Sequence, residues 1–518
     1  MNCRGGFIHN SSITIKYLNK NSPFNEFDRS MNFRSSTDFA VESTSPLPVA
    51  AASQNIMTSE ESANNWQQGA LLTLEITDIN DVGEGVGRVD SHVVFVPDTA
   101  IGDWADVRLV RIKKNYGYGQ LQNLVISSAD RIRPNCIVAD KCGGCQLQHI
   151  SYSAQLAAKQ NQVMQTMRRI GSIDPALVLP IIGAESDLGY RNKVTYPLGV
   201  GATGQVKAGY YQKGSHKIVN LNQCPIQDQR LNPLLAGIKQ DIVDQEWLIY
   251  DPERLTNVAQ FRHLSMRIGR RTGEILITLV ASGGQMPNSL PDKAQEWLTQ
   301  YPGVVGVCLN TQPNQNNVVF GEQTRIIAGR DYVTEEFADL KWRLGADTFF
   351  QVYTEQAEVM LKVILDRLKL TGHEFLLDAY CGIGTFSLPL ANKVRQVLGI
   401  EVHETSVNQA RGNASINGIT NALFEAGDCG ELMTDLEQRP DIVLLDPPRQ
   451  GCDRLVLENL IGRPPQQLVY ISCKPSTLAR DLKLLIESGR FELLGIQPVD
   501  FFPQTAHVEC AAFLVGKD

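Results

Sequence analysis

The fold of this chain is predicted by one stretch of its sequence, Phe375-Leu376-Leu377-Asp378-Ala379-Tyr380-Cys381-Gly382-Ile383-Gly384-Thr385-Phe386. An apolar run enters a glycine turn there. Three further apolar runs, 397–400, 442–445 and 468–471, follow it and are separated by helical sequence. Apolar runs that alternate with helices are typical of a parallel sheet covered on both faces. We therefore expect residues 346–518 to form a Rossmann-like, doubly wound α/β domain.

A nucleoside pocket is predicted at the carboxyl ends of these runs, where open α/β sheets bind their ligands. Gly382 and Gly384 let the backbone approach a ligand closely. Glu401 ends the second run, where it can accept both ribose hydroxyls, and Asp428, after Phe424, can bond an adenine amino group. The third glycine of a dinucleotide fingerprint is missing. The pattern favours S-adenosylmethionine over NAD, with an NAD site or a non-catalytic Rossmann domain as the alternatives.

Two motifs after the later runs indicate the chemistry. Asp446-Pro447-Pro448-Arg449 places an acid on a rigid turn at the pocket, a pattern that also occurs in amino-group methyltransferases. Cys473 stands at the carboxyl end of the next run, with Lys474 beside it to favour the thiolate. Carbon-5 of a pyrimidine is a poor nucleophile until a group such as a thiolate adds at carbon-6. We interpret Cys473 as that nucleophile; the alternative is a small buried hydrophobic side chain.

This reaction also needs a base that removes the carbon-5 proton. His507 and Glu509 alternate into the C-terminal apolar strand, so both side chains can project onto one face. Either can be the base, and desolvation would raise the basicity of a sheltered Glu509. A glutamate at a strand start is more often solvated surface, so only the requirement of the reaction supports this role.

Three segments precede the catalytic domain. Residues 1–67 are rich in Ser, Asn and Thr without an apolar period, which predicts a disordered tail, a targeting segment or a mis-assigned start. Residues 68–127 contain short alternating strands and a glycine-rich turn, which predict a small OB-like β-barrel. Residues 128–345 are interpreted as a central mixed α+β domain that includes an amphipathic helix from Gln155 through Met167.

The cysteines predict a metal centre. Their odd number, 11 in 518 residues, argues against a disulfide framework and for a reducing compartment, the cytoplasm. Cys136, Cys142 and Cys145 form a C-x5-C-x2-C triplet, and Cys224 lies before a proline further along the chain. Zinc usually takes two C-x2-C pairs, so this asymmetric set favours an iron–sulfur cluster, with zinc or unligated thiols as the alternatives.

Charge gives no global sign of a nucleic acid partner, because 48 basic and 56 acidic side chains leave a net charge of −8. A binding surface must therefore be a local patch. Residues 188–227 contain no acid, and their cations alternate with tyrosines that can stack on unpaired bases. These residues are Arg191, Lys193, Lys207, Lys213, Lys217, Tyr190, Tyr196, Tyr210 and Tyr211. A second acid-free stretch holds Arg262, His263, Arg267, Arg270 and Arg271.

In combination, these motifs resemble those of the uracil-C5 RNA methyltransferase family. The resemblance rests on the turn at 378–386, Leu-Leu-Asp-Pro-Pro-Arg at 444–449, Ser-Cys-Lys-Pro at 472–475 and Phe-Pro-Gln-Thr-Ala-His-Val-Glu at 502–509. It covers about residues 68–518, and the barrel segment resembles the TRAM domain of ribosomal members. It implies methyl transfer from S-adenosylmethionine to carbon-5 of a uridine, with Cys473 as nucleophile and Glu509 as base.

The resemblance also implies the ligands of two sites. Cys136, Cys142, Cys145 and Cys224 would hold a [4Fe-4S] cluster with a structural role. The residues that would line the S-adenosylmethionine site are Gln351, Tyr380, Thr385, Glu401, Asp428 and Asp446. Thr385 replaces an Asn that is frequent in the family's turn, and Asp428 stands where relatives have Asn, so these two contacts are the least securely implied.

We therefore predict a monomeric 23S rRNA uracil-C5 methyltransferase that acts on a single-stranded or loop uridine, without a DNA or membrane partner. No run of ~18 apolar residues is present to span a bilayer. The uridine must leave its stack to reach Cys473, and Phe349 or Phe350 can support it. The alternatives are a tRNA uridine methyltransferase, whose simplest members lack the barrel and the cluster, a non-catalytic RNA-binding iron–sulfur protein, and nitrogen methylation through Asp446.

Overall fold

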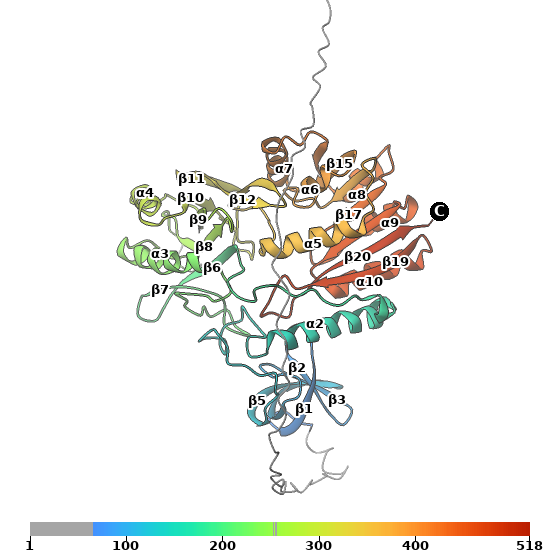
Figure 1. Cartoon of the computed structure of the whole chain (residues 1–518). Coiled ribbons are helices and arrows are strands. Elements are labelled where there is room, and N and C mark those ends of the chain that lie inside the picture. The colour runs from blue at the N-terminus through green and yellow to red at the C-terminus, as the bar shows by residue number, and fades with distance from the viewer. Residues whose placement is uncertain (1–65, 252, 254–255, 518) are drawn as a thin grey trace, which may run out of the picture. The chain divides into compact units, whose positions relative to one another are not determined.

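The computed structural model describes residues 66–251, 253 and 256–517. Within these residues the chain forms, in order along the sequence, a closed barrel, a six-stranded sheet, a two-stranded hairpin and a seven-stranded sheet (Figure 1). The segment 1–65, which holds nearly all of the predicted tail, lies outside the described residues.

The N-terminal barrel closes because its first strand pairs with both the second and the fourth. The strands are β1 (Leu71–Ile79), β2 (Gly85–Val89), β3 (His92–Val96), β4 (Trp104–Ile112) and β5 (Tyr116–Ile126), in the order β1-β2-β3-β5-β4. Along β1 the side chains alternate between exposed and buried, and Leu72, Leu74 and Ile76 enter the barrel core. The predicted small barrel is confirmed. The alternation in the sequence arises because successive side chains of a strand point to opposite faces, one of which is the barrel core.

The C-terminal sheet has the order β16-β15-β14-β17-β18-β20-β19. Its strands are β14 (Phe375–Ala379), β15 (Gln396–Glu401), β16 (Ala422–Ala426), β17 (Ile442–Leu445), β18 (Gln467–Ser472), β19 (Phe491–Val499) and β20 (Glu509–Gly516). The first five are parallel, whereas β20 runs antiparallel to both of its neighbours. The order reverses between β14 and β17, so the ligand crevice is expected at the carboxyl ends of these two strands. The predicted doubly wound sheet is confirmed.

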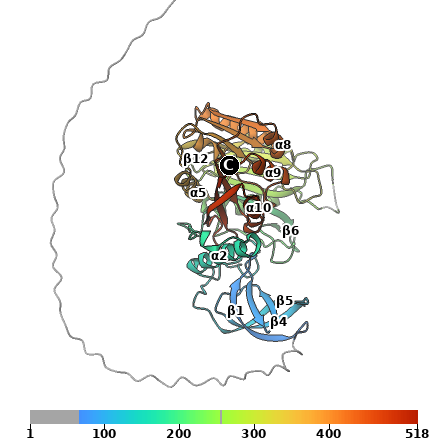
Figure 2. The same cartoon turned by 90° about the vertical axis from the view of Figure 1, so that its right-hand side faces the viewer.

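Successive side chains of these strands enter two separate cores, one on each face of the sheet. Leu376 lies in the core shared with α5, α6 and α7, and Leu377 lies in the core shared with α8, α9 and α10. The helices are α5 (Thr354–Arg367), α6 (Ser387–Ala391), α7 (Glu404–Ile416), α8 (Cys429–Thr434), α9 (Arg454–Gly462) and α10 (Pro475–Glu487). The strands therefore read as continuous apolar runs, because both faces are covered by helices (Figure 1 and Figure 2).

The central sheet has the order β11-β10-β9-β8-β6-β7. Its strands are β6 (Lys193–Val200), β7 (Val206–Ala208), β8 (Phe261–Ile268), β9 (Ile275–Ala281), β10 (Val304–Thr311) and β11 (Gln323–Gly329), followed by the hairpin of β12 (Tyr332–Phe337) and β13 (Leu340–Gly345). Helices α3 (Asn232–Asp244) and α4 (Leu290–Gln300) contribute to the same core. Every residue of β9 is buried.

The predicted amphipathic helix is α2 (Tyr152–Thr166), which continues into one π-helical turn, Met167–Gly171. Val163 and Met167 lie in a core of the C-terminal sheet. The extended chain after this turn also joins that sheet, because Val178 forms a bridge to Ile496. The residues that precede the central sheet in the sequence therefore pack against the C-terminal sheet. Two short 3-10 turns, Pro175–Leu177 and Gln229–Leu231, complete the described helical structure.

Two further properties concern the described part of the chain. None of its helices combines the length and the apolar character that crossing a bilayer requires. The ten cysteines within it are all free.

Candidate active site

The turn after β14 forms one wall of the predicted nucleoside pocket. Tyr380, Gly382 and Gly384 have left-handed backbones, with φ angles of 74°, 56° and 86°. A Cβ on Gly382 would meet only open space, whereas a Cβ on Gly384 would lie 3.1 Å from Leu388. Thr385 is buried at the end of the turn. The backbone at Gly382 is therefore accessible to a ligand, as the glycine pattern predicts.

Glu401 and Asp428 lie beyond the next two strands. The Glu401 carboxylate accepts the backbone N–H groups of Gly382, at 3.2 Å, and His403, at 2.9 Å. Asp428 is exposed, and its carboxylate caps α8 by accepting the N–H of Glu431 at 3.0 Å. Both acids lie at the carboxyl edge of the sheet, where they were expected, and each also stabilises its own loop.

Buried carboxyl groups gather beside this turn. Burial raises the pKa of Asp446, which follows β17, to about 7. Burial also raises the pKa of Asp378 to about 8, although Ser387 donates a hydrogen bond to it; Asp446 and Glu401 raise this pKa further. The Nε2 atom of Gln351 lies 3.5 Å from Oδ2 of Asp446. A group of acids that oppose one another's ionisation favours a cation bound beside it.

Cys473 and Glu509 lie at the adjoining ends of two neighbouring strands. β18 and β20 pair so that Ser472, the last residue of β18, lies opposite Cys510. Cys473 directly follows Ser472, Glu509 is the first residue of β20, and the charge of Glu509 raises the pKa of Cys473. Cys473 is half-buried, and Glu509 is 3% exposed. The fold therefore brings together two residues whose motifs lie far apart in the sequence.

The cation beside Cys473 is Arg449 and not Lys474. Burial raises the pKa of Cys473 to about 11, the charges of Glu509 and Asp446 raise it further, and the Arg449 guanidinium lowers it. Lys474, which was predicted for this role, is exposed and is not among the leading groups that shift this pKa. Sequence reasoning quoted Arg449 as the last residue of its motif without giving it a role.

Of the two candidate bases, Glu509 lies in β20 and its charge acts on Cys473. Burial raises the pKa of Glu509 well above its ordinary value, and Asp446 adds to this, while Arg449 opposes it. His507 precedes β20, is exposed, and packs edge-on against Phe502 with ring centroids 5.9 Å apart.

Of the two phenylalanines expected to support an extruded base, only Phe349 is accessible. Its side chain is 63% exposed, whereas Phe350 is 1% exposed and packs against Phe337 and Trp342. The expectation for Phe350 is wrong, because its ring belongs to the core beneath the sheet.

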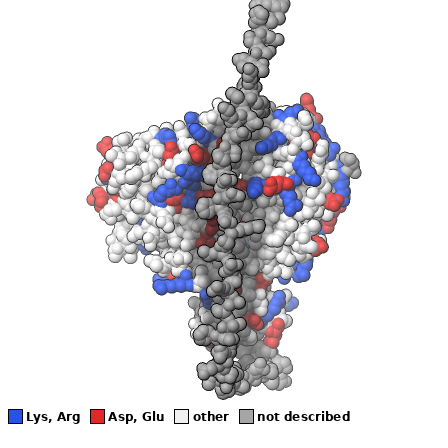
Figure 3. Space-filling view, viewed as in Figure 1, with Lys and Arg blue, Asp and Glu red and all other residues white. Residues whose placement is uncertain are grey.

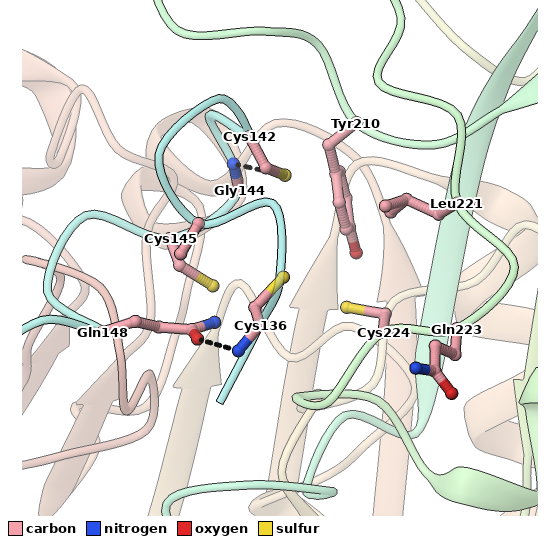
Figure 4. A pocket seen from close by; sticks show the side chains of 10 residues that line it. Cys136, Cys142, Gly144, Cys145, Gln148, Tyr210, Leu221, Gln223 and Cys224 are labelled. Carbon is pink, nitrogen blue, oxygen red and sulfur yellow. Dashed lines mark hydrogen bonds between the residues drawn. The ribbon is translucent and has the colours of Figure 1, made fainter. Parts of the chain in front are cut away.

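The four cysteines of the predicted cluster line one pocket, with their sulfurs directed toward a common space (Figure 4). The loop 136–145 supplies Cys136, Cys142 and Cys145, and Cys224 approaches from a separate loop. Burial, with a smaller contribution from the other three thiols, raises the pKa of the Cys145 thiol to about 12. Residue 143 must be a glycine, because a Cβ there would lie 2.9 Å from the Tyr211 carbonyl oxygen.

Among the described residues, no group of three or more His, Cys, Asp or Glu side chains is arranged to hold a metal ion. The four cysteines lie around one pocket, and their assignment to a [4Fe-4S] cluster stays a prediction.

Two of the four tyrosines in the first acid-free stretch are buried. Tyr190 and Tyr196 are fully buried, and the Tyr190 hydroxyl donates to the Pro503 carbonyl at 3.0 Å. Lys193 donates to the Ala346 carbonyl at 2.9 Å. The predicted stacking role of these tyrosines is wrong, because their rings join segments of the protein to one another.

The second acid-free stretch is not a free basic surface either. Arg262 and Arg267 are buried and donate to backbone carbonyls. Arg270 and Arg271 form ion pairs with acids from other segments. On the face drawn in Figure 3, Lys and Arg side chains are interspersed with Asp and Glu. Several cations that look unpaired in the sequence are therefore held by tertiary contacts, either with backbone carbonyls or with acids.

An exposed groove of about 680 Å³ lies beside the cysteine pocket. Barrel residues, including Gly83 and Asp98, line it together with the segment 210–214. Tyr211 is 44% exposed there, and Lys213 pairs with Asp98 at 2.5 Å. Tyr211 and Lys213 are the accessible aromatic and basic residues that the stretch contributes to this groove.

Comparison with known families assigns both ends of the described chain. The profile of the tRNA (Uracil-5-)-methyltransferase family matches residues 151–517, and the TRAM domain profile matches residues 65–122. The chain belongs to the tRNA (uracil-5-)-methyltransferase family. It is therefore an enzyme, an S-adenosylmethionine-dependent RNA methyltransferase of the uracil-C5 class, and its N-terminal barrel is a TRAM domain.

Similar proteins cover nearly the same length as this methyltransferase. An uncharacterized RNA methyltransferase from Nostoc sp. is 56% identical over 88% of this chain and 99% of its own. Another from Listeria innocua is 37% identical over 88% of this chain and 100% of its own. Among solved structures, the tRNA (uracil-54, C5)-methyltransferase of Pyrococcus abyssi, in complex with S-adenosyl-L-homocysteine, is 26% identical with a TM-score of 0.69, over 86% of this chain and 99% of its own.

Proposed function

We propose that this methyltransferase transfers a methyl group from S-adenosylmethionine to carbon-5 of a specific uridine in 23S rRNA, through a covalent bond between Cys473 and carbon-6. The observation that carries the mechanism is the position of Cys473, directly after the Ser472–Cys510 pair and close enough to Glu509 and Asp446 for their charges to raise its pKa. A nucleophile and a base on adjacent strands can act on neighbouring carbons of one uracil ring.

The proposed reaction has three steps. The Cys473 thiolate adds to carbon-6, which forms a C–S bond and an enolate across carbon-5 and the carbon-4 carbonyl. Carbon-5 then attacks the methyl group, so that a C–C bond forms, the sulfonium S–CH3 bond breaks and S-adenosylhomocysteine leaves. Glu509 removes the carbon-5 proton, and the electron pair restores the C5=C6 double bond and expels the thiolate.

The charges of the site support these roles. Arg449 lowers the pKa of Cys473, which favours the thiolate that the first step needs. Burial raises the pKa of Glu509, which makes its carboxylate a stronger base for the third step. The sulfonium and ammonium groups of bound S-adenosylmethionine would lower the raised pKa of Asp446 and keep it ionised.

We propose that the co-substrate binds over the turn after β14. Glu401 would accept the ribose hydroxyls and Asp428 would accept the adenine amino group, while the open space at Gly382 admits the nucleoside. The other residues proposed to line this site are Gln351, Tyr380, Thr385 and Asp446.

We also propose that Cys136, Cys142, Cys145 and Cys224 hold a [4Fe-4S] cluster. The support is their shared pocket and the directions of their sulfurs (Figure 4). Methyl transfer moves no electron between enzyme and substrate, so the cluster would serve as a cross-link between two loops. Iron and sulfide analysis of enzyme purified without oxygen tests this, with four of each expected per chain.

RNA is proposed to lie along the groove between the TRAM barrel and the segment 210–214. Tyr211 offers a stacking face there, and Phe349 is the accessible ring proposed to support the extruded uridine. The proposal retains a barrel domain at 68–127, a central iron–sulfur domain at 128–345 and a catalytic domain at 346–518. It describes a monomer in the cytoplasm, where thiols stay reduced.

A tRNA uridine is the second candidate substrate. The Pyrococcus abyssi enzyme is named for a tRNA target and covers 86% of this chain. Additional domains around the catalytic sheet therefore do not by themselves distinguish rRNA from tRNA enzymes. Mapping of 5-methyluridine in rRNA and tRNA from cells with and without the gene decides between them: loss of one 23S rRNA site supports the proposal, and loss of a tRNA site replaces it.

The chemistry is tested by trapping. RNA that contains 5-fluorouridine cannot release a proton from carbon-5, so the adduct with Cys473 should persist in the presence of S-adenosylmethionine. We expect a protein–RNA complex that survives denaturation and is absent with Cys473→Ala. An active enzyme that methylates carbon-5 without such a complex would exclude the covalent mechanism.

A further inference from the structure

Gln504 lies in the connection between β19 and β20 that leads into Glu509, and all of its polar groups are engaged. Its backbone N–H donates to Oε1 of Gln155 at 2.9 Å, and its Oε1 accepts from Nε2 of Gln155 at 3.1 Å. Its Nε2 donates to the Asp187 carboxylate at 2.8 Å. The side chain is 2% exposed. Gln504 thus joins the C-terminal connection to α2 and to the segment before β6.

The backbone of Gln504 also joins the loop that carries the cysteines. Its carbonyl oxygen accepts the N–H groups of Gln146, at 3.1 Å, and Leu147, at 3.0 Å, directly after Cys145. Gln504 has a φ angle of 70°, which is unfavourable for a residue with a side chain. Such a backbone persists only where its surroundings hold it in place.

The start of the same connection is fixed by a buried ion pair. Lys159 of α2 lies 2.7 Å from the Asp500 carboxylate, and both side chains are almost fully buried. Tyr152 donates to the same carboxylate at 3.0 Å, and Lys159 also donates to the Phe502 carbonyl at 3.0 Å. With Asp500 and Gln504 both anchored, the chain that enters β20 has little freedom to move.

We propose that Gln504 is a positioning residue that sets Glu509 against the substrate and couples this placement to the loop carrying Cys142 and Cys145. The inference rests on the proposed role of Glu509 as the base. Displacement of Glu509 would block one step of the reaction, the removal of the carbon-5 proton. If Glu509 is displaced, the carbon-5 proton stays, the C5=C6 double bond cannot re-form, and the bond from carbon-6 to Cys473 does not break.

The first experiment compares Gln504→Leu with Gln497→Leu. Gln497 is a matched control, because it is 8% exposed on the neighbouring β19 and donates its own amide hydrogen bond to Pro180 at 2.7 Å. Each enzyme receives ordinary uridine RNA and S-adenosylmethionine. For Gln504→Leu we expect turnover to fall about a hundredfold, as small misplacements of catalytic groups do, while a methylated covalent protein–RNA complex accumulates. Gln497→Leu should turn over without accumulating it.

A second pair of variants separates this role from a general loss of packing. Gln504→Glu places a carboxylate against Asp187 and should show the same accumulation of adduct. Adding Asp187→Asn restores the hydrogen bond with its direction reversed, because the amide introduced at position 187 can donate to the carboxylate introduced at position 504. The double variant should therefore return turnover toward that of wild type. The coupling to the cysteine loop is tested with Cys145→Ala, which should raise the ratio of trapped complex to product as Gln504→Leu does.

The outcomes separate this inference from the proposed function. If wild type forms no complex with 5-fluorouridine RNA, the covalent mechanism is wrong and the inference falls with it. If wild type is trapped but Gln504→Leu turns over like Gln497→Leu, or loses trapping and turnover together, only the positioning role is wrong. If Cys145→Ala releases product without accumulating adduct, or forms neither, the coupling to the cysteine loop is wrong.

Discussion

Cys473 and Cys145 carry the same side chain in opposite environments. Cys473 is half-buried at the end of a strand, where burial and two carboxylates raise the pKa of its thiol and the Arg449 guanidinium lowers it. Cys145 lies in a pocket where burial, with a smaller contribution from three further thiols, raises its pKa to about 12. A single thiolate can be favoured by one guanidinium, whereas four adjacent thiolates need the charge of bound metal. The surroundings therefore predict a nucleophile at one site and a ligand at the other.

The largest effect that separates the two sites is expected from Cys473→Ala. Without a nucleophile at carbon-6, carbon-5 is not activated, and methyl transfer should fall on the order of 10⁶-fold, as for other covalent nucleophiles. Transfer of labelled methyl groups to RNA measures this. Cys308→Ala is the control, because Cys308 is fully buried outside both sites and should leave the rate unchanged. A Cys473→Ala enzyme with wild-type activity would remove the distinction between the two cysteine environments.

Glu509→Gln should have the next largest effect, on the order of 10²–10⁴-fold on turnover, which is the usual contribution of a general base. The amide cannot accept the carbon-5 proton, so the adduct with Cys473 should form and accumulate on unmodified RNA. Denaturing electrophoresis of the reaction measures the adduct, and Glu492→Gln, at an exposed ion pair with Lys517, is the control. Loss of adduct formation together with turnover would assign Glu509 to the first step instead of the third.

Cys224→Ala should change stability and metal content before it changes chemistry. Removing one of four pocket thiols should abolish stoichiometric iron and lower the Tm by about 5 °C or more, because two loops lose their cross-link. Cys473→Ala should keep both the iron and the Tm. Iron analysis and thermal unfolding of the two variants, purified without oxygen, make the comparison. Equal iron in both variants would refute the assignment of the pocket to a cluster.

The barrel and the C-terminal sheet could be predicted from the sequence. The C-terminal strands are continuous apolar runs because both faces of their sheet are covered, and β1 alternates because only one of its faces is buried. The central sheet was not specified, since β8 and β9 are almost completely buried and show no period that separates a strand from a buried helix.

The candidate site was predictable in its parts and not in its arrangement. The motifs indicated Cys473 and Glu509, but their apposition depends on the antiparallel register of β18 and β20, which local sequence does not determine. The basic and aromatic residues of the acid-free stretches were misinterpreted. Arg267 and Tyr190 are buried and donate to carbonyl groups, and nothing in a run of such residues distinguishes this from an exposed RNA surface. Tertiary partners decide that difference.

The smallest predicted effect concerns the pKa of Cys473 itself. Iodoacetamide alkylates the thiolate form of cysteine. Because the pKa of Cys473 is about 11, its thiolate fraction, and with it the alkylation rate, should rise about tenfold per pH unit between pH 7 and 10. Arg449→Gln removes the cation that lowers this pKa, so the thiolate fraction at pH 8 must fall, and alkylation should slow by up to about tenfold for each unit that the pKa rises. Arg454→Gln, at an exposed arginine on α9, is the control. Mass spectrometry of Cys473 after timed alkylation gives the rate. A rate that does not change in Arg449→Gln would mean that the guanidinium does not stabilise the thiolate, and the contrast with the cysteine pocket would then rest on burial alone.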